Sequence, residues 1–202
     1  MSGEVDGLSL PYVLVLHGLN GSGPTHWQNW LAGELARHGG LVDLPEFSEP
    51  DAPDRQRWLD ELRGHLAAAP TSLERVVVAH SLAGLLWLHH AASGVDPVLR
   101  VDRVLLVAPP APDFAGEPLI AGFLHPRLDP TALRQAGVST RLVLGEGDPY
   151  CTLAQGKALA EAVRIEVDVV VGGGHLNVGS GYGSWPAVLK WVRNDRTPLT
   201  PR

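Results

Sequence analysis

Short runs of consecutive apolar residues alternate along the chain with longer amphipathic stretches, and this alternation restricts the fold more than any other feature. The runs 76–78 (Val-Val-Val) and 104–107 (Val-Leu-Leu-Val) are apolar at every position, which is typical of strands covered on both faces. We expect strands at about 12–16, 40–44, 75–79, 103–108, 141–144 and 166–171, and helices at about 26–38, 54–68, 82–92, 153–162 and 185–193. Strands that alternate with helices run parallel and are joined by right-handed crossovers. The sequence therefore predicts an α/β fold with a doubly wound, mainly parallel six-stranded sheet and helices on both faces.

The chain of 202 residues is long enough for one domain with a sizeable apolar core. Its sequence shows no internal repeat, no low-complexity tract and no linker that would divide it. We therefore expect a single domain over residues 1–202, with frayed ends at about 1–10 and 194–202. Residues 109–137 are the least regular part and are rich in proline, so we expect them to form the rim of a site or a minimal lid.

Composition and charge narrow the classes of partner. The formal net charge is −6 and the sequence contains no basic run, which argues against a nucleic-acid or anionic-membrane partner. The single cysteine, Cys151, excludes an internal disulfide. Residues 1–10 lack both a basic start and a long apolar run, so we expect no signal peptide and a cytoplasmic location.

Ligands of a parallel sheet bind beyond the carboxyl ends of its strands, so the strand exits are the places to look for a functional site. The third expected strand runs directly into Ser81, and a helix is expected to begin at the next residue. A serine on such a turn, with small residues two positions away on either side, is typical of the nucleophile elbow of a hydrolase. Ala79 and Ala83 stand at those two positions, where glycine is usual. The pattern predicts Ser81 as a nucleophile, and the alternative is that its hydroxyl only caps the following helix.

A serine hydroxyl needs an adjacent base, and the base needs a partner that holds it in one tautomer. In hydrolases with this elbow, the order along the chain is serine, acid, histidine. His175 follows the last expected strand on a run of three glycines and is the only histidine after Ser81 that comes at a strand exit in that order. We therefore predict His175 as the base; the alternative is a loop histidine that faces solvent.

Three carboxylates compete for the role of the acid. Asp148 lies in a Gly-Glu-Gly-Asp-Pro turn after the penultimate strand, Glu146 lies two residues earlier, and Asp113 follows the preceding strand. We assign the role to Asp148, although a residue of this type also serves simply to form the turn before a proline. Asp113 is the main alternative, because some hydrolases of this fold class take their acid from the earlier strand.

Backbone N–H groups at two strand exits are expected to form an oxyanion hole. The N–H of Leu82 follows the nucleophile, and the N–H of Leu19 belongs to the glycine-containing loop after the first strand. A phosphate-binding role for that loop is disfavoured, because the sequence contains no G-x-x-x-x-G-K-[ST] motif. The sequence also contains no metal-ligand spacing and no cofactor motif, so we expect neither a metal nor a cofactor.

Taken together, these motifs resemble the small, nearly lidless α/β-hydrolases related to the retinoblastoma-binding serine hydrolase. The resemblance extends over nearly the whole chain and is carried by residues 17–18, 25–27, 30, 79–84, 106–109, 148–151, 174–177, 181–183 and 185–186. It implies a reduced α/β-hydrolase fold with a minimal lid, a triad of Ser81, Asp148 and His175, and activity on simple esters. The chain departs from the family pattern at Ala79 and Ala83, where glycine is common.

The sequence thus predicts a serine hydrolase that cleaves carboxylic esters through an acyl-serine intermediate. Short acyl chains are expected, because no long insertion is available to cover the site. The expected partner is a small-molecule ester. The alternative is a non-catalytic binding protein on the same scaffold, because a fold does not fix a function. The complete set of serine, acid and histidine favours the enzyme.

Overall fold

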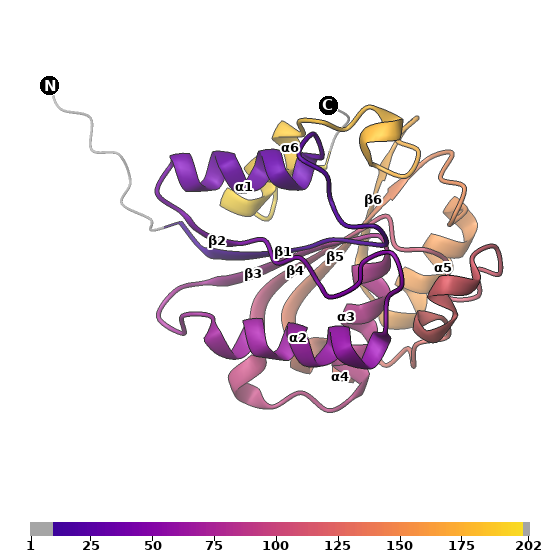
Figure 1. Ribbon diagram of the computed structural model, residues 1–202, viewed down its shortest axis with the longest axis horizontal. Coiled ribbons are helices and arrows are strands. Elements are labelled where there is room, and N and C mark those ends of the chain that lie inside the picture. The colour runs from indigo at the N-terminus through magenta and orange to yellow at the C-terminus, as the bar shows by residue number, and fades with distance from the viewer. Residues whose placement is uncertain (1–9, 200–202) are drawn as a thin grey trace, which may run out of the picture.

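The computed structural model describes residues 10–199 and is built around one parallel sheet (Figure 1). The strands follow the order β2-β1-β3-β4-β5-β6, and every neighbouring pair is parallel. Their bounds are β1 (Tyr12–Leu16), β2 (Leu41–Asp43), β3 (Arg75–His80), β4 (Val101–Val107), β5 (Gly137–Gly145) and β6 (Glu166–Val170). This topology confirms the predicted α/β fold with a six-stranded parallel sheet.

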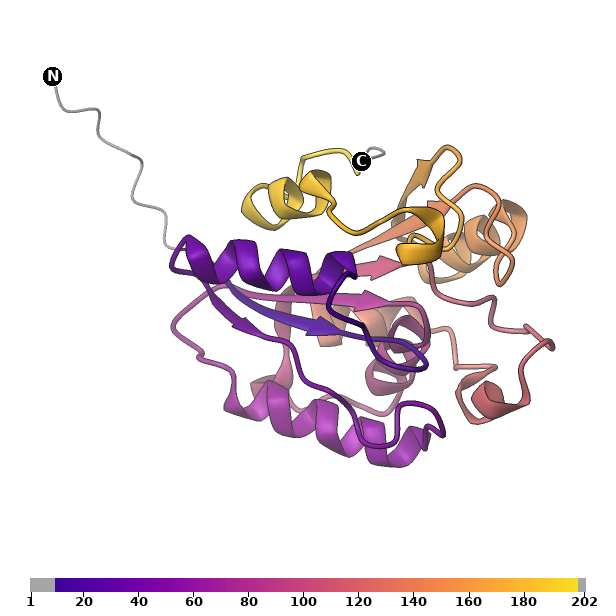
Figure 2. The same cartoon turned by 45° about the horizontal axis from the view of Figure 1, so that its top comes forward.

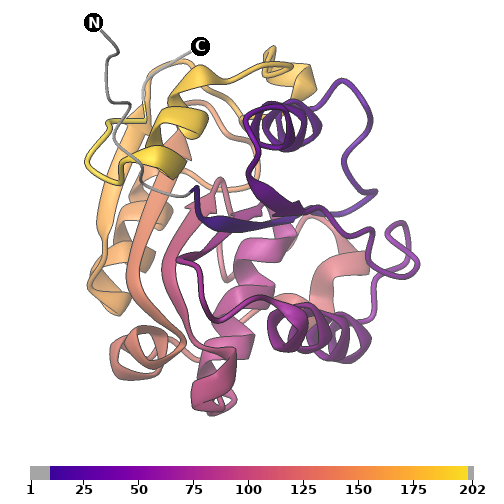
Figure 3. The same cartoon turned by 90° about the vertical axis from the view of Figure 1, so that its left-hand side faces the viewer.

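Helices cover both faces of the sheet (Figure 3). They are α1 (Trp27–Arg37), α2 (Arg55–Ala68), α3 (Leu82–Ala92), α4 (Pro130–Ala136), α5 (Leu153–Val163) and α6 (Pro186–Arg193), with short 3-10 helices η1 (Pro97–Leu99), η2 (Pro118–Phe123) and η3 (Val178–Ser180). Successive strand residues point to opposite faces. Val13 and Val76 therefore pack with α1 and α6, whereas Leu14 and Val77 pack with α2, α3, α4 and α5. Both faces are buried, which is why the central strands are apolar at consecutive positions.

The region 109–137 contains more regular structure than the sequence predicts. Its first part includes η2, and its second part forms α4, which begins at Pro130 behind an Asp129 cap and packs against α3. β5 also begins at Gly137, four residues earlier than expected. The sequence did not indicate this start, because the first half of the strand is largely polar and partly exposed. An apolar run reveals only the buried half of such a strand.

The C-terminal segment differs from the expectation that it is frayed from residue 194. The backbone N–H of Leu199 donates to Asp168 Oδ2 at 3.2 Å, and the buried Leu199 side chain belongs to the hydrophobic cluster on the side of the sheet that α1 and α6 cover. Arg141 also donates to the backbone carbonyl of Asp195 at 2.9 Å. The expectation for residues 194–199 was therefore wrong, because a single leucine reaches the core and anchors the segment. Residues 1–9 and 200–202, also expected to be frayed, lie outside the described residues.

The loops that follow the strands gather at the end of the sheet where the parallel strands have their carboxyl ends (Figure 2). They include the exits of β1, β3, β4, β5 and β6, where the candidate site residues lie. Within residues 10–199, no helix has both the length and the apolarity needed to cross a bilayer.

Candidate active site

Ser81 occupies a strained turn between β3 and α3. Its backbone angles are φ 55° and ψ −123°, a region that residues other than glycine rarely adopt. Such a conformation costs about 1–3 kcal/mol and persists only where the surroundings enforce it. Here the Ser81 N–H donates to the carbonyl of Val107 at 2.8 Å. The Ser81 hydroxyl makes no capping hydrogen bond to α3, so the simple helix-cap interpretation does not hold.

Close packing around the turn requires small residues. A Cβ atom on Gly18 would lie 2.7 Å from Ser81 Cβ, and one on Gly84 would lie 2.9 Å from Pro109 Cβ. Ala79 and Ala83 are fully buried. The sequence pattern drew attention to position 83, and the structure shows a further close helix-to-loop approach one residue later, at Gly84.

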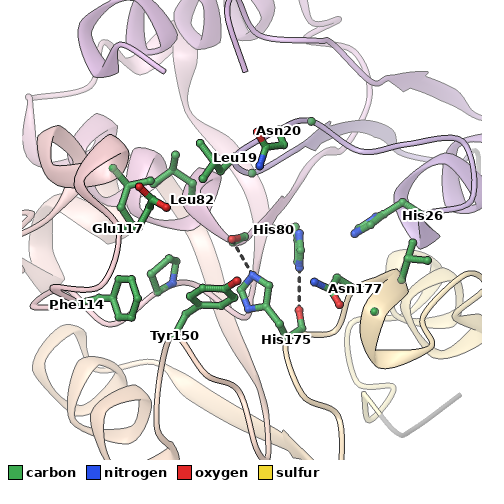
Figure 4. A pocket seen from close by; sticks show the side chains of 17 residues that line it. Leu19, Asn20, His26, His80, Leu82, Phe114, Glu117, Tyr150, His175 and Asn177 are labelled. Atoms are coloured by element: carbon green, nitrogen blue, oxygen red, sulfur yellow. Dashed lines mark hydrogen bonds between the residues drawn. The ribbon is translucent and has the colours of Figure 1, made fainter. Parts of the chain in front are cut away.

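His175 lies beyond β6 and is hydrogen-bonded at both ring nitrogens. Its Nε2 is 2.9 Å from Ser81 Oγ (Figure 4), and its Nδ1 is 2.9 Å from Asp148 Oδ2. The loop that carries His175 packs tightly on the exit of β5, because a Cβ on Gly145 would lie only 2.0 Å from the carbonyl oxygen of Gly174. The glycines thus bring the histidine to the serine and to the carboxylate.

The three candidate acids have different partners. Asp148 is buried, and its Oδ1 accepts the backbone N–H of Tyr150 at 2.9 Å while Oδ2 faces His175. Glu146 accepts the N–H of Gly172 at 3.1 Å. Asp113 is exposed and accepts a hydrogen bond from Gln155 at 3.2 Å. Asp148 is therefore the carboxylate that is positioned to orient the imidazole.

The loop after β1 is held next to the serine by a buried histidine. His17 accepts the backbone N–H of Phe47 at Nε2 (2.8 Å), so its Nδ1 carries the proton and donates to the carbonyl of Gly18 (2.7 Å). Burial lowers the pKa of His17, which keeps the ring neutral for this arrangement. The predicted oxyanion donors, Leu19 and Leu82, both line the pocket beside Ser81, and within residues 10–199 neither backbone N–H donates a hydrogen bond.

A cavity of about 390 Å³ opens beside Ser81 and His175. Its lining combines the loop after β1, the elbow, the segment 110–120 and the loops after β5 and β6. The sequence-based expectation that 109–137 forms a rim therefore holds for its first part, whereas α4 packs elsewhere. The other lining residues are Gly18, Leu19, Asn20, Gly21, His26, His80, Leu82, Pro110, Phe114, Glu117, Ile120, Tyr150, Asn177, Val178 and Gly179.

Two aromatic rings flank His175 and escaped the sequence analysis. His80 donates from Nε2 to the backbone carbonyl of His175 at 3.1 Å, and its ring centroid lies 5.1 Å from that of His175. Tyr150 lies on the other side, at 4.5 Å between centroids in an edge-to-face arrangement. The position of His80 directly before Ser81 was the available signal, because that residue necessarily lies at the elbow.

Cys151 is close to Asp148 in the sequence but is not a reactive thiol. Its side chain is buried. This burial, and to a smaller extent the negative charges of Asp148 and Asp113, raises the pKa of the thiol to about 12. A thiol is reactive as the thiolate. Cys151 therefore contributes to packing rather than to chemistry.

Comparisons with known proteins identify the family of the chain. The family model described as "Serine hydrolase" matches residues 13–194. YdeN of Bacillus subtilis (strain 168) is 25% identical over 179 residues, which cover 87% of this chain and 91% of YdeN.

Solved structures show the same fold. The crystal structure of the ydeN gene product from B. subtilis has a TM-score of 0.78 at 22% identity, over 91% of this chain and 97% of that one. A YdeN-like protein from Pectobacterium atrosepticum gives 0.69 at 24% identity, over 92% and 90%. A dienelactone hydrolase from Anabaena variabilis gives 0.62 at 20% identity, over 96% and 88%. The relation to the retinoblastoma-binding enzyme stays a prediction, whereas the match over residues 13–194 shows that the chain belongs to the serine hydrolase family.

Proposed function

We propose that this protein cleaves carboxylic esters through an acyl-serine intermediate, with Ser81 as nucleophile, His175 as base and Asp148 as the orienting acid. The observation that carries the proposal is the pair of 2.9 Å contacts that link the His175 ring to Ser81 Oγ and to Asp148 Oδ2. A hydroxyl bonded to a base that is itself oriented by a buried carboxylate is activated for attack. The cytoplasm is the proposed location, which suits a chain whose single cysteine is a buried free thiol.

The first half of the proposed reaction forms the acyl-serine. Ser81 Oγ attacks the ester carbonyl carbon while His175 Nε2 takes the hydroxyl proton, and Asp148 stabilises the resulting imidazolium through Nδ1–H. The carbonyl electron pair moves to oxygen, where the N–H groups of Leu82 and Leu19 stabilise the negative charge. When this intermediate collapses, the bond to the alcohol oxygen breaks, and the alcohol leaves with the proton from His175.

In the second half, a water molecule replaces the alcohol. His175 Nε2 takes a proton from the water as its oxygen attacks the acyl carbon, and the same two N–H groups stabilise the oxyanion. The bond to Ser81 Oγ then breaks, Ser81 recovers its proton from His175, and the carboxylic acid leaves.

The size of the cavity supports a preference for short acyl chains. Its volume of about 390 Å³ lies near the lower end of the range of about 300–1,000 Å³ that is usual for small-molecule pockets.

Hydrolysis of p-nitrophenyl esters from acetate to decanoate tests the proposal. We expect the wild-type protein to turn over the short esters fastest, and Ser81→Ala to lose about a thousandfold or more in rate with its thermal midpoint preserved. A Ser81→Ala protein that keeps more than a few per cent of the wild-type rate would rule out Ser81 as the nucleophile. If the decanoate reacts fastest, the short-chain part of the proposal is wrong.

A further inference from the structure

The cavity beside the triad has two unlike halves. Phe114 and Tyr150 lie on one side of the His175 ring, and His80 and His26 lie on the other (Figure 4). The rings form a continuous row, with centroid distances of 5.6 Å (Phe114–Tyr150), 4.5 Å (Tyr150–His175), 5.1 Å (His175–His80) and 5.0 Å (His80–His26). One end of this row therefore consists of a phenyl and a phenol ring, and the other carries the nitrogens of two imidazole rings.

The hydrogen bonds at the polar end fix which atoms are donors and which are acceptors. His26 Nδ1 accepts the N–H of Gln28 at 3.3 Å, so the proton of the neutral ring is on Nε2. His80 donates from Nε2 to the carbonyl of His175, so its Nδ1 is an acceptor. Asn177 Oδ1 accepts the N–H of Ser180 at 3.0 Å, which identifies the other amide atom as the donor Nδ2.

Three polar atoms at this end are thus available for hydrogen bonds to a ligand. His26 Nε2–H and Asn177 Nδ2–H are donors, His80 Nδ1 is an acceptor, and none of them has a hydrogen-bond partner within residues 10–199. All three residues line the cavity, and both histidines are buried. None of these three atoms is among the fully buried side-chain atoms without a partner, so they open to the cavity, where a ligand group that matches their donor and acceptor pattern can replace water. Within the described residues, no group of three His, Cys, Asp or Glu side chains is arranged to hold a metal ion.

The charge of the cavity restricts the ligand group further. Burial, and to a smaller extent the charge of His175, lowers the pKa of His26 to about 4. Burial also lowers the pKa of His80 well below its usual value, with smaller contributions from the charges of His175 and His26. Both rings are therefore neutral at neutral pH. The lining contains the carboxylate of Glu117 and neither lysine nor arginine, so an anionic group would find no counter-charge.

We propose that His26, His80 and Asn177 form a subsite that binds an uncharged hydroxyl group of the substrate. A hydroxyl donates one hydrogen bond and accepts others, so it pairs with His80 Nδ1 while accepting from His26 Nε2–H or Asn177 Nδ2–H. The inference rests on the proposed esterase function and specifies its substrate class. The substrate is an ester with an apolar part and with a hydroxyl near the cleaved bond, either on the alcohol or on the acyl chain.

Pairs of isosteric esters test the subsite. One pair, 2-hydroxyethyl butanoate and propyl butanoate, places the hydroxyl on the alcohol; the other, ethyl 3-hydroxybutanoate and ethyl 3-methylbutanoate, places it on the acyl chain. Each ratio of kcat/KM is divided by the ratio of alkaline hydrolysis rates, which removes differences in intrinsic reactivity. We expect at least about a tenfold preference for the hydroxylated ester in one pair, and that pair identifies the part of the substrate that carries the hydroxyl. Monoethyl succinate should react more slowly than ethyl pentanoate.

His26→Asn is the matched variant, because asparagine is a good helix N-cap but is too short to place a donor where Nε2 lies. The preference should fall to within about threefold of unity, whereas His38→Asn, at the exposed opposite end of α1, should keep it. Corrected kcat/KM ratios near unity in both pairs for the wild-type protein would overturn the subsite, whatever the variants do. An unchanged preference in His26→Asn would also overturn it, as would a faster reaction of monoethyl succinate than of ethyl pentanoate. Hydrolysis of p-nitrophenyl acetate distinguishes failure of the subsite from failure of the esterase function. If this ester is hydrolysed but no hydroxyl preference is found, only the subsite is wrong. If no ester reacts, the proposed function is wrong.

Discussion

Asp148 and Asp113 stand at neighbouring strand exits, and the sequence favours Asp148 without excluding Asp113. The difference lies in their surroundings. The side chain of Asp148 is almost fully buried and contacts His175, whereas that of Asp113 lies at the surface and accepts one hydrogen bond from Gln155. Only a carboxylate that contacts Nδ1 selects the tautomer in which Nε2 accepts the proton of Ser81.

The substitutions Asp148→Asn and Asp113→Asn therefore separate the two residues. We expect Asp148→Asn to lower kcat on the order of 10⁴-fold, because an amide at this position favours the wrong tautomer. Asp113→Asn should retain most of the wild-type rate, since its side chain does not contact the imidazole. Steady-state kinetics on p-nitrophenyl acetate provide the measurement, and the reverse ranking would move the acid to the exit of β4.

At the scale of the elements, the approach of α3 to the loop after β4 determines how the elbow is built. Gly84 lies in the first turn of α3, and any Cβ there meets the rigid ring of Pro109. The same helix begins with Leu82, whose N–H is a proposed oxyanion donor. A shift of α3 away from Pro109 therefore also moves this proposed donor.

Glycine-to-alanine substitutions in three helices test this packing with opposite expected signs. Gly33→Ala in α1 and Gly64→Ala in α2 meet nothing within 4 Å and should stabilise the protein by about 0.5–1 kcal/mol, because alanine is the better helix former. Gly84→Ala should destabilise it by about 1–3 kcal/mol through overpacking, and should lower kcat as well. Urea unfolding and ester hydrolysis measure both effects. Stabilisation by Gly84→Ala with normal turnover would show that the contact with Pro109 is not tight.

At the scale of the whole molecule, buried histidines link stability to pH. Burial lowers the pKa of His26 and of His90 to about 4, with smaller contributions from the charges of His175 and Arg63 respectively, and His80 is lowered in the same direction. In the unfolded chain, these side chains titrate near 6.5. Between about pH 6.5 and 4, the unfolded state therefore binds more protons, and the free energy of unfolding falls as the pH falls.

Between about pH 7 and 4.5, we expect a loss of up to about 2–3 kcal/mol for each of His26 and His90, at up to about 1.4 kcal/mol per pH unit. His90→Leu should reduce the slope and raise stability at neutral pH, because both ring nitrogens of His90 are buried and lack a hydrogen-bond partner in the described part of the chain. His38→Gln, at an exposed position, serves as the control. Urea unfolding at several pH values is the measurement, and equal slopes for His90→Leu and the wild-type protein would contradict the account.

The sequence predicted those features that local patterns encode. Strands covered on both faces and helices with apolar stripes appear where expected, and the order of polar residues at strand exits pointed to the three side chains that the structure brings together. The first half of β5 and the anchored Leu199 were missed, because a polar strand edge and a single distant contact leave no local period. The proposed hydroxyl subsite was also not predicted, because His26 and His80 are 54 positions apart in sequence. Their rings come together only because the first residue of α1 lies next to the last residue of β3 in the fold.

Covalent labelling of Ser81 tests the central claim most directly, because it needs an activated hydroxyl and no knowledge of the substrate. A fluorophosphonate should add one equivalent of mass to the wild-type protein and to Ser72→Ala, a control at an exposed serine, and peptide mapping should place the adduct on Ser81. Ser81→Ala should remain unlabelled, and His175→Ala should react far more slowly. A folded wild-type protein that stays unlabelled, or an adduct on any other residue, would contradict the assignment of Ser81 as an activated nucleophile.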